Sequence, residues 1–171
     1  MKAEEVFEIA RTIAKGTKFD PLLVTAVCQQ ESSFDHHAVR LEQGFYRRYV
    51  EKMELASTSE VLLSASYGLM QVMGLTLLEL GYFKWFLAWN NEQPGAVELT
   101  ESDSQMTVVK GIDEFMKRPD WQVLWGVRTL EAKSKMTTGV HQTLLAYNGG
   151  GNLHYPDEVL SKLNQLQTTL S

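Results

Sequence analysis

Apolar residues recur every three or four positions along most of this chain, which is the spacing of amphipathic helices. The first such segment covers residues 6–14. Asp20 and Pro21 then provide an N-cap and a first-turn proline, which predict a second helix running to about Ser32. Strand signals are weak, although residues 55–75 could hold a small β-ribbon. The pattern predicts a mainly α fold, α+β in the manner of lysozymes, with at most that small ribbon.

Helical spacing continues through the rest of the chain, interrupted by glycine, proline and serine clusters. Residues 38–64 contain a helical stretch, around Phe45, Tyr46, Tyr49 and Met53, and then a serine-rich turn near Ser57. Further helices are predicted after Gly68 and over 75–80, 106–116, 123–130, 137–148 and 156–170. Inside one of them, Gly126 permits another element to approach closely. The least regular segment is 84–100, where Asn90–Asn91 and Pro94–Gly95 mark a surface loop.

The length and composition fit one compact domain with a sizeable core. The chain has 171 residues, of which 44% are hydrophobic and 22% are charged, as in an ordinary globular protein. We therefore expect a single domain over residues 1–171, with an irregular insert at about 84–119. The net charge of -5 gives no reason to expect nucleic acid or an anionic membrane as a partner. No apolar run is long enough to span a bilayer, so we expect a soluble monomer without membrane insertion.

Candidate metal and cofactor ligands are sparse. Cys28, the single cysteine, lies in an apolar run and is interpreted as a buried structural thiol. His36 and His37 are adjacent, so their side chains would diverge on a helix, and His141 and His154 lack suitably spaced Cys or Asp partners. The glycines at 149–151 follow a helix rather than a strand, which argues against a phosphate loop. We expect no metal site and no cofactor.

Glu31 is the strongest candidate for chemistry from spacing alone. Leu23, Val27 and Glu31 follow one another at intervals of four and share a helix face. Partial burial on an apolar face and the negative end of the helix dipole both raise the pKa of a carboxyl group. A raised pKa favours the protonated form that a general acid needs. The same spacing also allows the plainer interpretation of a glutamate at a frayed helix end, pointing into water.

Three short motifs favour the first of these two interpretations of Glu31. Residues 30–34 are Gln-Glu-Ser-Ser-Phe, residues 68–73 are Gly-Leu-Met-Gln-Val-Met, and residues 146–150 are Ala-Tyr-Asn-Gly-Gly. In this order they resemble the motifs of Slt-type lytic transglycosylases and goose-type lysozymes. The resemblance covers about residues 18–83 and 120–156, whereas 84–119 matches nothing. A modest departure is Gln122, at a place where the family often has asparagine.

The resemblance implies a lysozyme-like fold and an enzyme that cleaves the β-1,4 bond between N-acetylmuramic acid and N-acetylglucosamine in peptidoglycan. Glu31 would be the general acid and then the base. Met70 and Gln71 would line the cleft, Tyr147 would lie close to Glu31, and Asn148 would help to fix the loop. The implied substrate-binding residues are Gly68, Met70, Gln71, Tyr147 and Asn148.

A second carboxylate would distinguish hydrolysis from transglycosylation, because ordinary glycosidases use a pair. The available acids, none of them in a recognisable motif, are Asp35, Glu42, Glu54, Glu60, Asp103 and Asp113. Lytic transglycosylases need only one, since the C6 hydroxyl of the muramic acid attacks C1 and gives a 1,6-anhydro product. We therefore expect transglycosylation. The alternative is a hydrolysing goose-type lysozyme, with Asp103 or Asp113 as its base.

The expected site of action is the cell wall. The first residues do not resemble a signal peptide, since Glu4 and Glu5 precede an interrupted amphipathic pattern. A phage or prophage product therefore fits best, either as a lysin released through a pore or as a virion component; a piece of a larger secreted protein is the other option. Arg47 and Arg48 could contact muropeptide carboxylates, but a solvated helix face is the better interpretation of this pair. A non-catalytic glycan-binding or assembly protein is the rival class, and the intact Glu31 argues against it.

Overall fold

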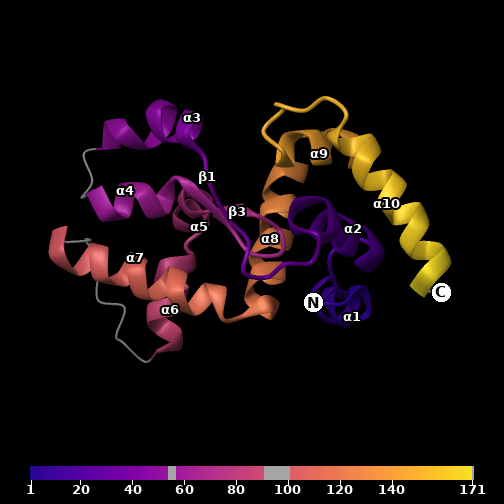
Figure 1. Cartoon of the computed structure of the whole chain (residues 1–171), viewed down its shortest axis with the longest axis horizontal. Helices are drawn as coiled ribbons and strands as arrows, with labels where there is room; N and C mark the ends of the chain where they lie inside the picture. Colours follow the sequence, from indigo (N-terminus) through magenta and orange to yellow (C-terminus); the bar gives the residue numbers. More distant parts are fainter. Residues whose placement is uncertain (54–56, 91–100, 171) are drawn as a thin grey trace.

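A computed structural model describes residues 1–53, 57–90 and 101–170 of the chain (Figure 1). Helices make up most of this described part, as the apolar spacing predicts. The α-helices are α1 (Ala3–Ile13), α2 (Pro21–Ser32), α3 (Gln43–Phe45), α4 (Ser57–Leu63), α5 (Gly74–Glu79), α6 (Tyr82–Trp89), α7 (Glu101–Met116), α8 (Pro119–Ser134), α9 (Gly139–Tyr147) and α10 (Tyr155–Leu170). A π-helical turn, η1 (Tyr46–Val50), and a 3₁₀ turn, η2 (Glu51–Met53), follow α3.

A small antiparallel sheet accompanies the helices. Its strands are β1 (Val39–Leu41), β2 (Ala65–Tyr67) and β3 (Val72–Met73), in the order β1-β2-β3. The predicted ribbon within residues 55–75 is confirmed by β2 and β3. Strand β1 was not predicted from the sequence; it pairs Val39 with Tyr67 and Leu41 with Ala65. A three-residue strand is too short to show an alternating pattern, and its pairing with β2 decides the conformation.

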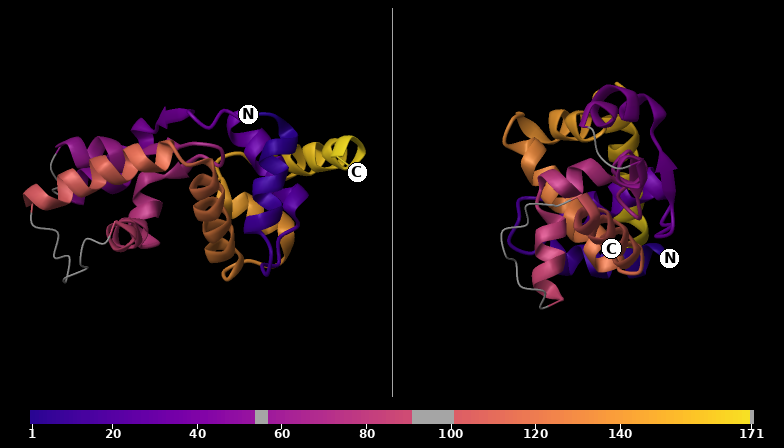
Figure 2. Two further views of the ribbon diagram at one scale, coloured as in Figure 1. Left: turned by 90° about the horizontal axis from the view of Figure 1, so that it is seen from below. Right: turned by 90° about the vertical axis from the view of Figure 1, so that its left-hand side faces the viewer.

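Helix α8 occupies the middle of the molecule (Figure 1). Helices α1, α2, α9 and α10 lie at one end, and α4 to α7 lie at the other; Figure 2 shows the same division from two further sides. Helix α8 packs against α1, α2 and α9 as well as α7 and β3. Its buried residues face several directions, as expected of a helix enclosed by other elements.

The segment expected to be irregular is partly helical. Helix α6 covers residues 82–89, and its aromatic side chains pack edge-on against α8: the ring centroids of Tyr82 and Trp125 are 5.3 Å apart, and those of Trp85 and Trp121 are 4.7 Å apart. Aromatic residues are only moderate helix formers, so this helix depends on tertiary packing that spacing does not reveal. The predicted loop at Asn91, Pro94 and Gly95 lies outside the described residues.

The caps of α2 explain where its last turn falls. The Asp20 side chain accepts a hydrogen bond from the Leu22 amide at 2.7 Å, and Pro21 occupies the first turn, as predicted. The helix ends at Ser33, whose φ of 53° is left-handed. Glu31 therefore lies in the final turn, while Leu23, Val27 and Cys28 are buried beneath it. In the part of the chain that is described, no helix is long and apolar enough to cross a membrane.

Candidate active site

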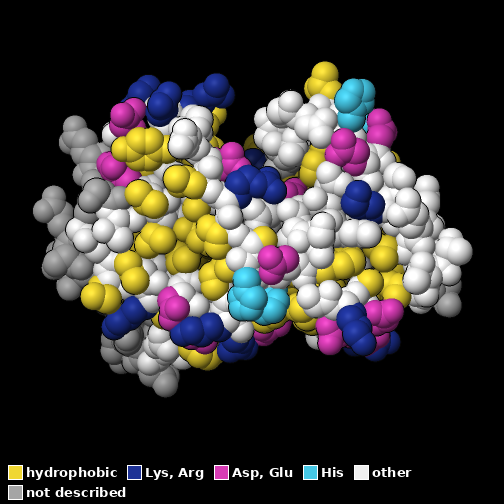
Figure 3. Space-filling model, viewed as in Figure 1, with side chains coloured by type: hydrophobic (Ala, Val, Ile, Leu, Met, Phe, Trp, Pro, Cys, Tyr) yellow, Lys and Arg dark blue, Asp and Glu magenta, His cyan; other side chains and the backbone are white. Residues whose placement is uncertain are grey.

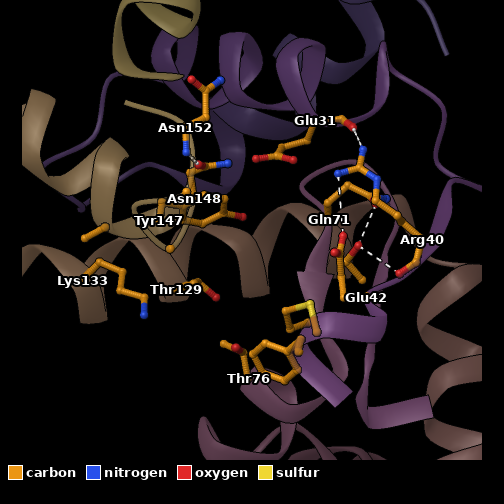
Figure 4. A pocket seen from close by; sticks show the side chains of 16 residues that line it. Glu31, Arg40, Glu42, Gln71, Thr76, Thr129, Lys133, Tyr147, Asn148 and Asn152 are labelled. Carbon is orange, nitrogen blue, oxygen red and sulfur yellow. Dashed lines mark hydrogen bonds and ion pairs between the residues drawn. The ribbon is translucent and has the colours of Figure 1, made fainter. Parts of the chain in front are cut away.

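A cavity of about 470 Å³ opens between the two ends of the molecule. It is lined by residues from α2, the sheet, α5, α8 and the segment joining α9 to α10. Figure 3 shows the surface notched between the α3 and α9 regions, and Figure 4 shows the lining side chains. Glu31, Gln71, Tyr147 and Asn148 all line this cavity, so the structure brings together residues from all three sequence motifs.

The Glu31 carboxyl group is directed into the cavity (Figure 4). The Tyr155 hydroxyl donates a hydrogen bond of 2.6 Å to its Oε1 atom. Burial raises the pKa of Glu31, and the negative charge of Glu42 raises it further, whereas the Tyr155 hydrogen bond and the positive charge of Arg40 lower it; the net direction is upward. The carboxyl group is thus held by a defined partner rather than pointing freely into water.

Tyr155 is a site residue that the sequence analysis missed. It is the first residue of α10, is 2% exposed, and is separated from Glu31 by 124 positions. No helical or strand spacing can connect positions so far apart. The contact depends on the packing of α10 against α2.

The glycine-methionine segment supports the cavity from behind. Gly68 has a φ of +70°, and a Cβ atom there would lie 2.3 Å from the Gln122 side chain, so this position requires glycine. The Met70 side chain is fully buried, close to Gly126 of α8. The expectation that Met70 lines the cleft is therefore wrong: its side chain fills the core, and only its backbone carbonyl serves the site, by accepting a 2.7 Å hydrogen bond from the Tyr147 hydroxyl. Gly68 likewise lies behind the cavity lining.

Gln71 lines the cavity with an amide that is largely engaged within the protein. Its Oε1 atom accepts a hydrogen bond from the Ser66 hydroxyl at 2.8 Å. Its Nε2 atom donates to the carbonyls of Gly68 at 2.9 Å and Ala38 at 3.0 Å. The residue adopts a left-handed φ of 46°. This network holds the sheet and the Gly68 turn in one arrangement beside Glu31.

Gln122 of α8 connects the site to the rest of the fold. It is fully buried; its Oε1 atom accepts from the Leu69 amide at 2.9 Å, and its Nε2 atom donates to the carbonyls of His36 at 3.0 Å and Phe115 at 3.1 Å. One side chain therefore joins three separate segments. The longer reach of glutamine, compared with asparagine, suits this role.

The loop between α9 and α10 forms another part of the cavity lining. Asn148 Oδ1 accepts a 3.0 Å hydrogen bond from the Asn152 amide, which confirms the prediction that Asn148 helps to fix this loop. Glu158 of α10 accepts hydrogen bonds from Asn152 Nδ2 at 3.3 Å and from Gln30 Nε2 at 2.7 Å. The loop is thereby fastened to α10 and to α2, next to Glu31.

The charged side chains lining the cavity, among the residues that the structure describes, are Glu31, Arg40, Glu42 and Lys133. Arg40 Nη1 lies 4.0 Å from Glu42 Oε1, and its Nη2 donates to the Glu31 backbone carbonyl at 3.5 Å (Figure 4). Glu42 is thus the second carboxylate at the cavity. Its position was not evident from the sequence, because it belongs to no motif and follows a strand that the pattern did not predict.

Among the other acids considered from the sequence, those whose side chains are described, namely Asp35, Glu60 and Asp113, do not line the cavity. Asp113 is on α7 and pairs with Lys117, so the expectation that it could serve as a base is wrong. Asp35 accepts a hydrogen bond from the His37 amide, and Glu60 accepts one from the Tyr46 hydroxyl. Glu54 and the Asp103 side chain lie outside the described residues.

The histidines also differ from expectation. His36 and His37 follow α2 in a turn rather than a helix, and their ring centroids are 3.8 Å apart instead of diverging. His141 has an acidic neighbour that the spacing did not reveal, with its Nε2 atom 3.5 Å from Asp157 Oδ1. Within the described ranges, no group of three or more His, Cys, Asp or Glu side chains is arranged to hold a metal ion.

Comparison with known proteins identifies the family of the segment that carries Glu31. Residues 8–84 match the family model described as the transglycosylase SLT domain. This segment includes Glu31 and Gln71, and it ends before the α9–α10 loop. Neither a search of curated proteins nor a search of solved structures gave a significant match. The mainly α structure with a small antiparallel sheet agrees with a lysozyme-like fold. Residues 8–84 are therefore similar to the transglycosylase SLT domain, the domain of the peptidoglycan-cleaving lytic transglycosylases.

Proposed function

We propose that this protein is a peptidoglycan lytic transglycosylase that cleaves the β-1,4 bond between N-acetylmuramic acid and N-acetylglucosamine, with Glu31 as its general acid and then its base. One observation carries the proposal. A carboxyl group with a raised pKa is directed into an open cavity and held there by the Tyr155 hydroxyl. Such an environment favours the protonated form, which is the form that a general acid needs.

The first step uses the proton of Glu31. The carboxyl group donates it to the glycosidic oxygen, the bond from that oxygen to C1 breaks, and positive charge develops at C1 of the muramic acid. Glu31 is left as a carboxylate. Tyr155 and Arg40 both stabilise this charged form, whereas burial favours the neutral form. These opposing influences suit a group that must give up a proton and then recover it.

The second step returns the proton. The C6 hydroxyl of the same muramic acid attacks C1, and its proton passes to the Glu31 carboxylate, giving a 1,6-anhydro ring and restoring the acid. No water is consumed. Because the hydroxyl is tethered to the reacting ring, its attack avoids the entropic cost of capturing a water molecule.

Replacement of the acid tests this proposal. Glu31→Gln keeps the shape of the side chain but removes its proton, so the rate of release of soluble fragments from purified peptidoglycan should fall by roughly 10²–10⁴-fold. The matched control is Glu79→Gln, an exposed position on α5, which should leave the rate unchanged. Circular dichroism should show both variants folded. A Glu31→Gln variant that clears cell-wall suspensions at nearly the wild-type rate rules out the assignment.

Hydrolysis is the second candidate, and the position of Glu42 is the observation that favours it. Glu42 lines the same cavity, and its charge acts on Glu31. A carboxylate there could activate water, as the second acid of a glycosidase does. The Glu42 carboxylate already faces Arg40 rather than standing free to hold a water molecule, which supports transglycosylation as the main outcome.

Mass spectrometry of the products separates the two reactions. Transglycosylation gives 1,6-anhydromuropeptides, which are lighter by one water than the reducing-end products of hydrolysis. We expect mainly anhydro products, and Glu42→Gln should leave their proportion unchanged. Exclusively reducing muramic acid ends, lost in Glu42→Gln, would assign the protein to the hydrolysing lysozymes.

We also propose that the protein reaches its substrate as a phage-type lysin or virion component. The support is the location of peptidoglycan outside the cytoplasm. Detection of the protein in purified particles, or in the lysate at the time of release, would test this. Finding the protein only in uninfected cells would contradict this proposal.

A further inference from the structure

Lys133 is a cation in the cavity that the proposed chemistry does not use. It lies in the last turn of α8, one helical turn after Thr129, and both residues line the cavity. Figure 4 shows it on the other side of the cavity from Arg40 and Glu42. Its side chain is partly buried, so its charge is not simply part of the outer surface.

The charge of Lys133 has no partner within the described part of the protein. No carboxylate among those residues lies within ion-pair distance of its Nζ atom. Arg40 differs, because it faces Glu42 and also donates to the Glu31 carbonyl. The negative end of the α8 dipole stabilises Lys133, but it leaves the ammonium group free to bind an anion.

The charges of the substrate identify that anion. The hydroxyl and acetamido groups of the glycan strand are neutral, and the lactyl carboxyl group of muramic acid is a neutral amide wherever a stem is attached. The carboxylates of peptidoglycan are on the peptide stem attached to the lactyl group of muramic acid. A cation across the cavity from the Arg40–Glu42 pair is therefore placed to contact a substituent of the sugar rather than to assist the departing oxygen.

We propose that Lys133 binds a carboxylate of the peptide stem and makes the enzyme prefer stem-bearing glycan strands to strands stripped of their peptides. This inference rests on the proposed function, since it names the substrate form that the same cavity selects. Lys133 is a specificity residue in this scheme, because its contact is made away from the reacting atoms.

Substrate discrimination is the quantity to measure. kcat/KM is determined on purified peptidoglycan and on the same material stripped of stems by an amidase, with the lactyl carboxyl groups that the amidase frees then converted to neutral methyl amides. In Lys133→Gln, the ratio of the two values should fall about tenfold, the effect of losing one hydrogen bond to a charged group. Lys133→Arg should retain the preference, and added salt should weaken it in the wild type.

Lys135→Gln is the matched control. It removes the same charge from the same end of α8, but Lys135 is exposed and does not line the cavity. Its ratio should equal that of the wild type. If Lys133→Gln and Lys135→Gln change the ratio equally, or if Lys133→Gln lowers both rates in proportion, the inference is wrong. A change in melting temperature without a change in the ratio would also show that Lys133 serves only the helix end.

A binding measurement separates this inference from the proposed function. In the Glu31→Gln background, calorimetry compares a disaccharide tetrapeptide with the same disaccharide whose lactyl carboxyl group carries a neutral methyl amide in place of the peptide. Adding Lys133→Gln should remove the preference for the tetrapeptide. If the wild type cleaves neither form of peptidoglycan, the proposed function fails, and this measurement alone decides the role of Lys133. If the Glu31→Gln variant, with Lys133 intact, binds both disaccharides with equal affinity, the inference about Lys133 is overturned.

Discussion

At the scale of single residues, the site depends on opposing influences at Glu31. Burial and the nearby charge of Glu42 favour the neutral acid, whereas Tyr155 and Arg40 favour the carboxylate. The Tyr155 ring is buried, and its hydroxyl supplies the hydrogen bond to Glu31. Each influence comes from a different element, so substitutions can remove them one at a time.

The raised pKa of Glu31 has a consequence for stability. An unfolded glutamate ionises near pH 4.3, and a folded-state pKa above that value makes the fold less stable as the pH rises through this window. Below the unfolded pKa the effect is absent. Glu31→Gln should therefore gain stability over the wild type as the pH increases from 4 to 7.5.

Urea unfolding of both proteins at several pH values tests this, with Glu79→Gln as the exposed control. The offset caused by the altered Tyr155 hydrogen bond is common to all pH values and subtracts out. If the difference in the free energy of unfolding between Glu31→Gln and the wild type is the same at every pH, the raised pKa of Glu31 is contradicted.

Tyr155→Phe removes the hydroxyl that lowers the pKa of Glu31. We expect the alkaline limb of the kcat/KM profile to move to higher pH, because the carboxyl group loses a partner for its charged form. The rate should also fall by roughly tenfold or more, since a hydrogen bond to a charged group is lost.

Tyr147→Phe provides the comparison, because that hydroxyl donates to the Met70 carbonyl and not to the acid. Tyr147→Phe should lower the rate without moving the alkaline limb of the kcat/KM profile. An unshifted limb in Tyr155→Phe would show that this tyrosine does not act through the protonation of Glu31.

The sequence predicted single residues well where a motif or a cap was present. Glu31, Gln71, Tyr147 and Asn148 come together at the cavity as the motifs implied. Met70 was misplaced, because a motif position does not distinguish a side chain that lines a cleft from one that fills the core beneath it. Tyr155 was missed, because its partner is remote in sequence.

At the scale of elements, α8 determines the geometry of the cavity from inside the molecule. It carries Gln122 and Gly126, which meet the Gly68–Gln71 turn. It also provides Thr129 and Lys133 to the cavity lining. Along this one helix, the residues at 122–126 therefore support the Gly68–Gln71 turn, and those at 129–133 face the cavity.

Close packing at Gly126 gives a prediction for this element. A Cβ atom there would lie 2.2 Å from Met70 Sδ and 2.7 Å from Met70 Cβ, as the sequence analysis anticipated when it placed a close approach at this glycine. Gly126→Ala should lower the free energy of unfolding by about 1–3 kcal/mol. Gly44→Ala is the control, because nothing lies within 4 Å of its added Cβ. Urea denaturation that finds the two variants equally stable would contradict the tight packing.

Elements with strong periodicity or clear caps, such as α2 and α7, could be predicted from the sequence. Two others could not. Helix α6 is stabilised by aromatic packing against α8, and β1 by pairing with β2. Both depend on partners distant in sequence, so local spacing carries no signal for them.

At the scale of the whole molecule, the cavity lies where two groups of helices meet, and α8 contacts both. This arrangement supports the prediction of a single domain, which unfolding experiments can test. The four tryptophans are on α6 and α8, whereas helices contribute to the circular dichroism throughout the chain.

Tryptophan fluorescence and circular dichroism should therefore give the same urea midpoint if the protein unfolds as one unit. Two separate midpoints would show that the α6–α8 region is an independent unit. The expected monomer and the phage-type release remain predictions as well.

The burial of Cys28 makes it possible to measure distances across the cavity with labels attached to introduced cysteines. Its side chain is inaccessible and burial raises the pKa of its thiol, so the reactive thiolate does not form under ordinary labelling conditions. Tyr49 and Leu153 are exposed, on η1 and on the loop before α10. Cysteines introduced at these two positions can carry a pair of spin labels, while the native thiol of Cys28 remains unlabelled. The separation of the labels would then report how far the two ends of the molecule approach each other when a glycan strand enters.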